Sequence, residues 1–319
     1  MFRPEIKVLD CTVRDGGLIN EHLFEDDFVR NVYNALVAAG IDYMEIGYKA
    51  SKKLFSPTKF GPWKFCDEDD IRRIVGDNET DLKLSAMIDV GKADYHEDVL
   101  PCSQSVLDMI RVATYAKEVD KAIDMIKDAH DKGYETTVNL MAVSTVLDFD
   151  LDEAIEQLAA SEVGTIYLVD SFGALYSEQV QFLIKKYMKA VEGTGKQIGI
   201  HAHNNQQLAY ANTIEAIILG ANRLDATIYG IGRAAGNCPL ELLIGFLKNP
   251  KFDLQPIIEV IQTTFLPLQE KIEWGYLIPY ALTGMFNQHP RAGMALRASE
   301  DRDNYVKFYD EQISAADLE

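Results

Sequence analysis

Short apolar and β-branched runs alternate with longer amphipathic stretches along most of this 319-residue chain. That alternation is typical of parallel strands joined by helices. Eight alternating strands and helices are the number that a (β/α)₈ TIM barrel requires, whereas a doubly wound open sheet uses fewer. We therefore predict the barrel. The eight predicted strands are Ile6–Asp10, Tyr43–Gly47, Lys83–Ile88, Met109–Val112, Thr136–Ala142, Thr165–Val169, Gln197–His201 and Arg223–Ile228.

Glycines follow the helical stretches between these strands, as expected for helix C-caps. The stretches with their glycines are Asp26–Ala39 with Gly40, Asp120–Asp131 with Gly133, Leu151–Ala160 with Gly164, and Ser177–Val191 with Gly193.

The chain continues after the eighth predicted strand for more residues than a (β/α)₈ barrel needs. Leu240–Lys248, after Pro239, is predicted to be the closing helix, and helical spacing appears again in Pro256–Lys271. We therefore expect a (β/α)₈ catalytic barrel over residues 1–250 and a helical C-terminal extension over residues 251–319. The extension could contribute to dimerisation, and we expect a homo-oligomer.

The composition excludes several classes of protein. A formal net charge of −19 and a pI near 4.7 disfavour a nucleic-acid partner, since no concentrated basic patch is present. No apolar run approaches membrane-spanning length, and the N-terminus lacks the pattern of a signal peptide. The four cysteines are scattered, without the spacing of a zinc site or a disulfide framework. We therefore expect a cytoplasmic protein without a membrane partner.

Two histidines end the seventh predicted strand. His201 and His203 are two residues apart, so the alternation of a strand directs both imidazoles to the same side. An isolated pair of this kind is as compatible with a structural role as with a metal site. The metal interpretation requires a carboxylate nearby.

Arg14 and Asp15 follow the first strand and can supply that carboxylate. In a closed barrel strand one pairs with strand eight, which brings Asp15 near the histidines of strand seven. Asp15, His201 and His203 would then form a site with open positions, suited to Mn²⁺ or Mg²⁺ and also to Co²⁺ or Zn²⁺. A 2-oxo acid could occupy those positions, and Arg14 would neutralise the negative charge of the enolate.

Three further segments lie where a barrel holds its active site. The glycine-rich loop Tyr229–Leu240 would let its backbone approach a ligand. Ser171, after strand six, could hold a substrate carboxylate or cap a helix. The long segment Tyr48–Asp70, rich in lysine and aromatic residues, is either a lid over the substrate or a surface excursion.

These residues together resemble the metal-dependent aldolase, lyase and Claisen-condensing superfamily, which includes 3-hydroxy-3-methylglutaryl-CoA lyase, isopropylmalate and homocitrate synthases and 4-hydroxy-2-oxovalerate aldolase. The matching motifs follow in order through about three quarters of the chain. They are Thr12-Val-Arg14-Asp15-Gly16, Glu45 in Met44-Glu-Ile-Gly47, Arg111-Val-Ala-Thr114, Asp170-Ser171-Phe-Gly173, His201-Ala-His203-Asn204, and Gly230-Ile-Gly232 through Gly236-Asn237.

The motifs around Arg111 and Ser171 are most similar to those of 4-hydroxy-2-oxovalerate aldolase. The resemblance implies a metal bound by Asp15, His201 and His203, with Asn237 beside it. It also implies that Arg14 stabilises a pyruvate enolate, that Glu45 supports Arg14 or the metal shell, and that Ser171 helps hold the substrate carboxylate. An aldehyde would be the second substrate, and an acylating aldehyde dehydrogenase would be a partner protein.

The chain departs from the aldolase pattern at the catalytic base. Where the aldolases have a histidine shortly after the Arg-Asp-Gly turn, this chain has Leu18. His22, Tyr48 and Lys49 are candidate replacements, and Tyr280 loosely matches a C-terminal tyrosine that assists the aldolases. Asn205 also stands where the family usually has aspartate.

The predicted function is a divalent-metal-dependent aldolase or lyase that acts on a 2-oxo acid, most simply by releasing pyruvate. A Claisen-type synthase acting on acetyl-CoA is an alternative, although residues 253–319 are short for the accessory domains of those synthases. A partner-dependent or catalytically altered subunit of an aldolase complex is another alternative, which Leu18 keeps open.

Overall fold

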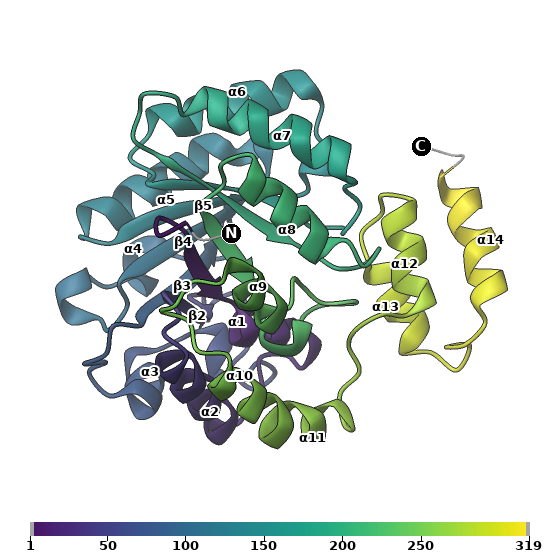
Figure 1. The fold of residues 1–319 in the computed structure, drawn as a ribbon, viewed down its shortest axis with the longest axis horizontal. Coiled ribbons are helices and arrows are strands. Elements are labelled where there is room, and N and C mark those ends of the chain that lie inside the picture. Colours follow the sequence, from purple (N-terminus) through teal and green to yellow (C-terminus); the bar gives the residue numbers. More distant parts are fainter. Residues whose placement is uncertain (1–2, 317–319) are drawn as a thin grey trace.

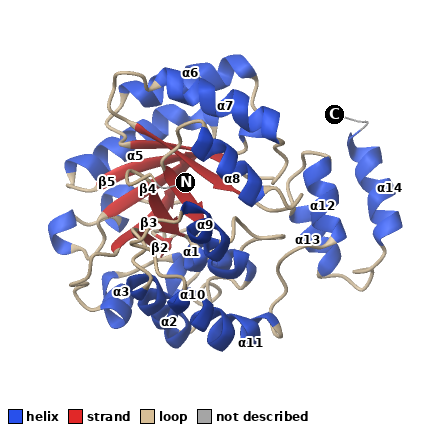
Figure 2. Ribbon diagram, viewed as in Figure 1, coloured by secondary structure: helices blue, strands red, loops and turns tan. Residues whose placement is uncertain are grey.

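Eight parallel strands close into a barrel in chain order, with β8 paired to β1 (Figures 1 and 2). This computed structural model describes residues 3–316. The predicted (β/α)₈ barrel is confirmed, and each predicted strand overlaps an observed one. The strands are β1 Lys7–Asp10, β2 Tyr43–Tyr48, β3 Lys83–Asp89, β4 Met109–Thr114, β5 Glu135–Leu140, β6 Thr165–Asp170, β7 Gln197–Ala202 and β8 Arg223–Ala226.

Helices surround the barrel (Figure 2). The predicted helices overlap α2, α5, α6, α7 and α9, whose ends differ from the predicted ones by at most a few residues. The helices up to residue 250 are α1 Thr12–Gly16, α2 Asp26–Ala38, α3 Glu68–Val75, α4 Tyr95–Asp98, α5 Val119–Asp131, α6 Asp148–Ala160, α7 Ser177–Ala190, α8 Ala209–Ile218 and α9 Leu240–Leu247.

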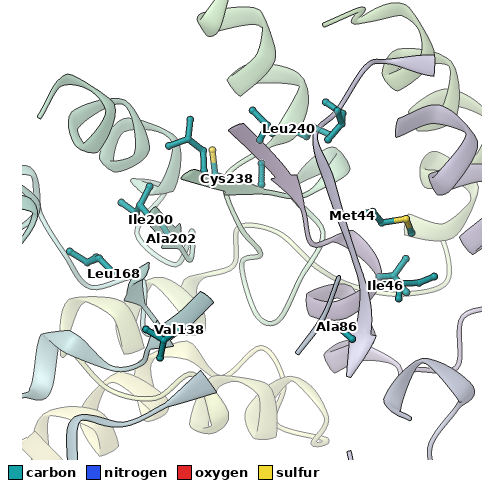
Figure 3. Close-up of a cluster of buried hydrophobic side chains, with 14 of the residues drawn as sticks. Met44, Ile46, Ala86, Val138, Leu168, Ile200, Ala202, Cys238 and Leu240 are labelled. Atoms are coloured by element: carbon teal, nitrogen blue, oxygen red, sulfur yellow. The ribbon is translucent and has the colours of Figure 1, made fainter. Parts of the chain in front are cut away.

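The main hydrophobic core lies between the strands and the surrounding helices. Alternate strand residues take part in it, such as Ile198, Ile200 and Ala202 of β7, because successive side chains of a strand point to opposite faces. Figure 3 shows part of this cluster, where side chains from β2, β3, β5, β6 and β7 lie with Cys238 and Leu240. The core thus fixes which strand positions face the barrel interior.

The interior positions carry polar and aromatic residues. Tyr167 of β6 is buried there, and the guanidinium of Arg111 lies 4.6 Å from the centre of its ring. Gly199 of β7 makes room for this tyrosine, since a Cβ at that position would lie 2.5 Å from the Tyr167 ring. The interior is therefore filled with side chains, and only its carboxyl end is left for a ligand.

The helices after residue 250 form two groups. The predicted helical stretch Pro256–Lys271 is divided into α10 Gln255–Val260, a π-helical turn at Ile261–Phe265 and α11 Leu266–Gln269. Pro267 lacks the N–H that a continuous helix would use, which accounts for the irregular turn before it. Residues of α10 contact α2 on the barrel.

The second group, α12 Ile278–Met285, α13 Arg291–Arg297 and α14 Tyr305–Ala316, lies beside the barrel (yellow in Figure 1). Gln206, after β7, donates a hydrogen bond to the Gly284 carbonyl of α12. The C-terminal helices are thus observed, while the division into domains at residue 250 stays a prediction.

No helix within residues 3–316 is long and apolar enough to cross a membrane. Residues 1 and 2, at the N-terminus that was predicted not to be a signal peptide, lie outside the described range. The last three residues of the predicted extension also lie outside it.

Candidate active site

A pocket opens at the carboxyl ends of the strands, and each strand or the loop after it contributes to its lining. The predicted residues Arg14, Asp15, Ser171, His201 and His203 all line it. This is the face on which TIM barrels hold their active sites.

The two histidines and Asp15 converge in this pocket. Nε2 of His201 lies 3.5 Å from Oδ2 of Asp15, and Nε2 of His203 lies 3.9 Å from the same oxygen. One ligand atom from each residue lies within 4.8 Å of the others, and all three residues are buried. Residues far apart in the sequence therefore form one candidate metal-binding group.

The protonation states of Asp15 and His203 suit a metal ligand. Burial by itself would raise the pKa of Asp15, but Arg14 and the two histidines outweigh it and hold this pKa well below its ordinary value. Burial, with help from Arg233, lowers the pKa of His203 well below its ordinary value. An ionised carboxylate and a neutral imidazole are the forms that bind a metal.

Asp225 orients His201 from below the pocket. Nδ1 of His201 lies 2.9 Å from Oδ2 of Asp225, which leaves Nε2 directed to Asp15. Cys11 lies 3.9 Å from the same Nδ1, so Cys11, His201 and Asp225 form a second close group of potential ligands. His201 belongs to both groups, and a carboxylate behind a histidine is the usual support of a metal ligand.

Arg14 is held between two carboxylates. Its Nε donates to Oε2 of Glu45 at 2.6 Å, and its Nη1 donates to Oδ2 of Asp15 at 2.5 Å. Arg111 lies 3.1 Å from the same Glu45 oxygen and donates to Asp225 at 2.6 Å. The remaining Arg14 nitrogen, Nη2, has no hydrogen-bond partner within the described chain. It is available for an oxyanion in the pocket.

Arg14 and Asp15 lie on the short helix α1, directly after β1, and not in an open turn. The glycine-rich loop after β8 packs against Asp15. A Cβ on Gly232 would lie 2.7 Å from Oδ1 of Asp15 and 2.1 Å from Nδ2 of Asn237. Glycine at position 232 therefore leaves room for the side chains of Asp15 and Asn237.

Ser171 and Asn237 lie at the edges of this arrangement. The Ser171 hydroxyl lines the pocket and accepts a hydrogen bond of 2.9 Å from the Ala142 backbone. Asn237 forms a β-bridge with His203 and donates to the Ile231 carbonyl, and its buried Oδ1 has no partner within residues 3–316. Asn237 is therefore beside the candidate ligands but outside the pocket lining.

Of the candidate replacements for the base, Tyr48 lines the pocket, and so does Leu18, which stands where the aldolases have their histidine. His22, Lys49 and Tyr280 are buried and are not among its lining residues. His22 packs against Gly17 and makes an edge contact with the Tyr48 ring, and Lys49 pairs with Glu68 at 3.2 Å.

Five basic residues that the sequence did not single out individually also line the pocket: Lys64, Lys92, Arg233, His289 and Arg291. Lys64 and Tyr48 come from the segment Tyr48–Asp70, so that segment does contribute to the pocket. His289 and Arg291 come from the C-terminal extension, where only the short run His289-Pro-Arg291 marks them. No strand-end pattern could have identified them.

Fold and pocket together define an enzyme of the TIM-barrel class with a buried cluster of potential metal ligands. Residues 5–264 match the family described as HMGL-like, and the chain belongs to that family.

The relatives define the reaction class. The oxaloacetate decarboxylase of Mycobacterium tuberculosis is 34% identical over 247 residues, covering 76% of this chain and 70% of the relative. The 4-hydroxy-2-oxovalerate aldolase of Pelotomaculum thermopropionicum is 30% identical over 251 residues, covering 79% and 72%. The crystal structure of the N-terminal domain of a presumed aldolase from Bacteroides vulgatus is 30% identical, with a TM-score of 0.77, covering 92% and 97%.

The predicted resemblance is therefore confirmed, and so is the predicted class of enzyme. This chain is a carbon–carbon lyase of the aldolase type. The roles of individual residues remain predictions.

Proposed function

We propose that this enzyme breaks or forms the bond to C3 of a 2-oxo acid, with pyruvate enolate as the shared intermediate, and most simply cleaves a 4-hydroxy-2-oxo acid into pyruvate and an aldehyde. The observation that carries this proposal is the convergence of Asp15, His201 and His203 beside Arg14 in one pocket.

The donor set fits a divalent cation, for which we propose Mn²⁺ or Mg²⁺, with Co²⁺ or Zn²⁺ as alternatives. Asp15, His201 and His203 would hold it, and the partnerless Oδ1 of Asn237 is consistent with a polar ligand nearby. When bound, such an ion would polarise the 2-oxo group and stabilise negative charge on its oxygen.

Arg14 would stabilise the developing oxyanion in this proposal. Its bonds to Glu45 and Asp15 fix the guanidinium, so that Nη2 is already oriented before substrate arrives. A fixed donor at a developing oxyanion lowers the barrier because it needs no reorganisation during the reaction. Ser171, after β6, lines the same pocket and would help hold the substrate carboxylate.

Tyr48 is better suited to donate a hydrogen bond than to act as the base. Burial raises the pKa of its hydroxyl, so this group stays protonated at neutral pH. It lines the pocket and would donate a hydrogen bond to the aldehyde oxygen as that oxygen becomes a hydroxyl. Leu18 lies in the same pocket and has no group that can take a proton.

Decarboxylation of oxaloacetate is a second candidate, and Leu18 favours it. Retro-aldol cleavage must remove the proton of the C4 hydroxyl, whereas loss of carbon dioxide from C4 of oxaloacetate requires no such base. Both reactions leave the same pyruvate enolate, so the proposed ligands and Arg14 would serve either one. The 34% identical relative is named for this reaction.

The test begins with pyruvate alone. We expect the enzyme with Mg²⁺ in D₂O to exchange the methyl protons of pyruvate, followed by proton NMR, and we expect Asp15→Asn to abolish the exchange. Cleavage of 4-hydroxy-2-oxovalerate and of oxaloacetate is then compared by coupling pyruvate to lactate dehydrogenase. Failure of metal-replete enzyme to exchange would contradict the proposal. Thiol release from acetyl-CoA with 2-oxo acids would favour the Claisen alternative.

Three broader proposals follow from the sequence, of which only the partner protein rests on the resemblance. We propose a homo-oligomer, association with an acylating aldehyde dehydrogenase that would receive the aldehyde, and a cytoplasmic location. Light scattering of the purified chain tests the homo-oligomer. Co-purification from its own host tests the partner protein, and fractionation of that host tests the location. A partner that restores activity to inactive isolated enzyme would support the partner-dependent subunit.

A further inference from the structure

The pocket carries more positive than negative side chains, although the whole chain has a formal net charge of −19. Its lining includes the cationic residues Arg14, Lys64, Lys92, Arg233 and Arg291, and the carboxylates Asp15 and Asp89. This local excess is the reverse of the overall charge, and it attracts anions into the pocket.

The two carboxylates are already paired. Asp15 accepts from Arg14 at 2.5 Å, and Asp89 accepts from Lys92 at 2.7 Å. Three cations therefore remain, and within residues 3–316 none of them has a carboxylate at ion-pair distance: Lys64, Arg233 and Arg291. A monoanionic 2-oxo acid can compensate one of these charges, but not all three.

Arg233 and Arg291 lie on either side of His289. Nη1 of Arg233 is 3.4 Å from Nε2 of His289, and the backbone N–H of Arg291 donates to Nδ1 of the same ring at 3.1 Å. Burial and the two arginines lower the pKa of His289 to about 3, so the ring stays neutral. The neutral ring of His289 thus contacts both arginine residues and compensates neither charge.

Arg233 is only partly satisfied. Its Nη2 donates to the Ser171 carbonyl at 3.1 Å, while its buried Nε has no partner within the described chain. Its backbone N–H donates to Oδ1 of Asp15 at 3.2 Å, so Arg233 is hydrogen-bonded to one of the candidate metal ligands. An anion beside Arg233 would therefore lie close to the reacting end of the pocket.

Lys64, in the segment after β2, increases the positive field in the pocket. Its side chain is only 7% exposed, and its ammonium lies 4.3 Å from the ring centre of Tyr48 and 4.6 Å from that of Phe55. These rings stabilise the cation without neutralising it. A buried ammonium without a carboxylate is costly unless an anionic ligand compensates it.

We propose that the substrate carries a second anionic group, a carboxylate or a phosphate, on the fragment released as the aldehyde, and that Arg233 and Arg291 bind this group. The inference rests on the proposed function. In the cleavage direction, a water molecule takes the proton of the C4 hydroxyl, the C3–C4 bond breaks, and its electron pair forms the enolate of pyruvate. The enolate then takes a proton from water at C3, so that no net proton is consumed. The anionic group remains on the aldehyde throughout.

The test compares an anionic aldehyde with a related uncharged one in the condensation with pyruvate. Succinic semialdehyde is paired with pentanal, and glyceraldehyde 3-phosphate with glyceraldehyde. We expect kcat/KM to be about 10- to 100-fold higher for the anionic member of at least one pair, the range expected of a charge-assisted hydrogen bond. The pair that shows the preference identifies the anion as carboxylate or phosphate.

Arg291 is exposed, so its variants should fold. We expect Arg291→Gln to bring the anionic preference near unity and Arg291→Lys to keep part of it. Arg302→Gln, an exposed arginine of the extension that pairs with Glu273, is the matched control and should keep the full preference. Equal rates for both members of both pairs, or a preference unchanged in Arg291→Gln, would overturn the inference.

Deuterium exchange of pyruvate separates this inference from the proposed function, because it needs no second anion. Exchange without an anionic preference refutes only the inference, whereas absence of exchange refutes the proposed function. If exchange is absent, calorimetry of anion binding tests the inference on its own. Succinate should bind more tightly than butyrate to the native enzyme, and Arg291→Gln should remove the difference. Equal binding of the two acids would refute the inference as well.

Discussion

His201 uses its two ring nitrogens for two different carboxylates. Nδ1 lies 2.9 Å from Asp225, and Nε2 lies 3.5 Å from Asp15. Asp225 itself is held by Arg111 at 2.6 Å. A proton shared with Asp225 stays on Nδ1, which leaves the lone pair of Nε2 free to bind a metal.

Asp225→Asn should therefore weaken metal binding, because an amide can donate to Nδ1 and so shift the ring proton to Nε2. We expect the dissociation constant for Mn²⁺, measured by calorimetry, to rise about 10- to 100-fold. Asp108→Asn, which alters a carboxylate outside the pocket that accepts from the Leu84 backbone, is the control. Unchanged Mn²⁺ affinity in a folded Asp225→Asn protein would argue against this positioning role.

Arg14→Lys should slow the chemical step more than it weakens metal binding. The three N–H groups of a lysine start from one nitrogen, so they cannot reproduce the separate positions of Nε on Glu45, Nη1 on Asp15 and the free Nη2. We expect kcat for pyruvate release to fall about 100- to 1,000-fold, as for other losses of an oxyanion donor. Mn²⁺ titration of the same protein checks that the metal still binds. A loss of only a few-fold in kcat would remove Arg14 from the proposed role.

Leu18→His should separate the two candidate reactions. The substitution introduces a proton acceptor in the pocket, where the resembling aldolases carry their base. We expect retro-aldol cleavage to become faster by at least about 10-fold, the lower part of the range for general-base catalysis, with little change in oxaloacetate decarboxylation. Leu18→Gln, which is polar but not basic, should give no such gain. Equal acceleration of both reactions would mean that the histidine acts in some other way.

His22 should be visible in the pH dependence of stability. Burial, with Lys64 and Arg14, lowers its pKa from 6.5 to about 3 in the folded protein. Between these pH values the unfolded chain binds a proton that the folded chain does not, so stability falls as pH falls from 6.5 towards 3. One such group contributes about 1.4 kcal/mol per pH unit.

Urea unfolding at pH 4, 5, 6 and 7, in the presence of a chelator, measures this effect. His22→Asn should reduce the slope of unfolding free energy against pH by about one proton, and asparagine tolerates the positive φ of 60° at this position. His130→Asn, at an exposed histidine, is the control. An unchanged slope in His22→Asn would show that the imidazole is accessible, as a catalytic base must be.

The strands could be located from sequence because their physical cause is local. Alternating or continuous apolar runs such as Ile198–Ile200 are buried whatever the partner, and glycines such as Gly40 end helices by their own backbone freedom. The interruption of the helical stretch after Pro256 was not predicted, since the irregular turn at Ile261–Phe265 depends on Pro267 and on packing of this stretch against α2.

The residues of the site likewise include some that the sequence could identify and some that it could not. His201 and His203 carried a local signal, and closure of the barrel was enough to expect Asp15 beside them. The placement of His22 behind Gly17 carried no such signal, because it depends on the left-handed backbone at Glu21 and His22 and on the segment Tyr48–Asp70 packed over them.

The sequence by itself thus determined the barrel, the family and the candidate ligands, since each depends on a local pattern or on the fixed order of the strands. Only the tertiary structure brought Asp225 and Arg111 behind His201, and His289 and Arg291 from the C-terminal helices to Arg233 in the pocket. These contacts join residues far apart in the chain. They arise from the packing of whole elements, which no pattern of neighbouring residues encodes.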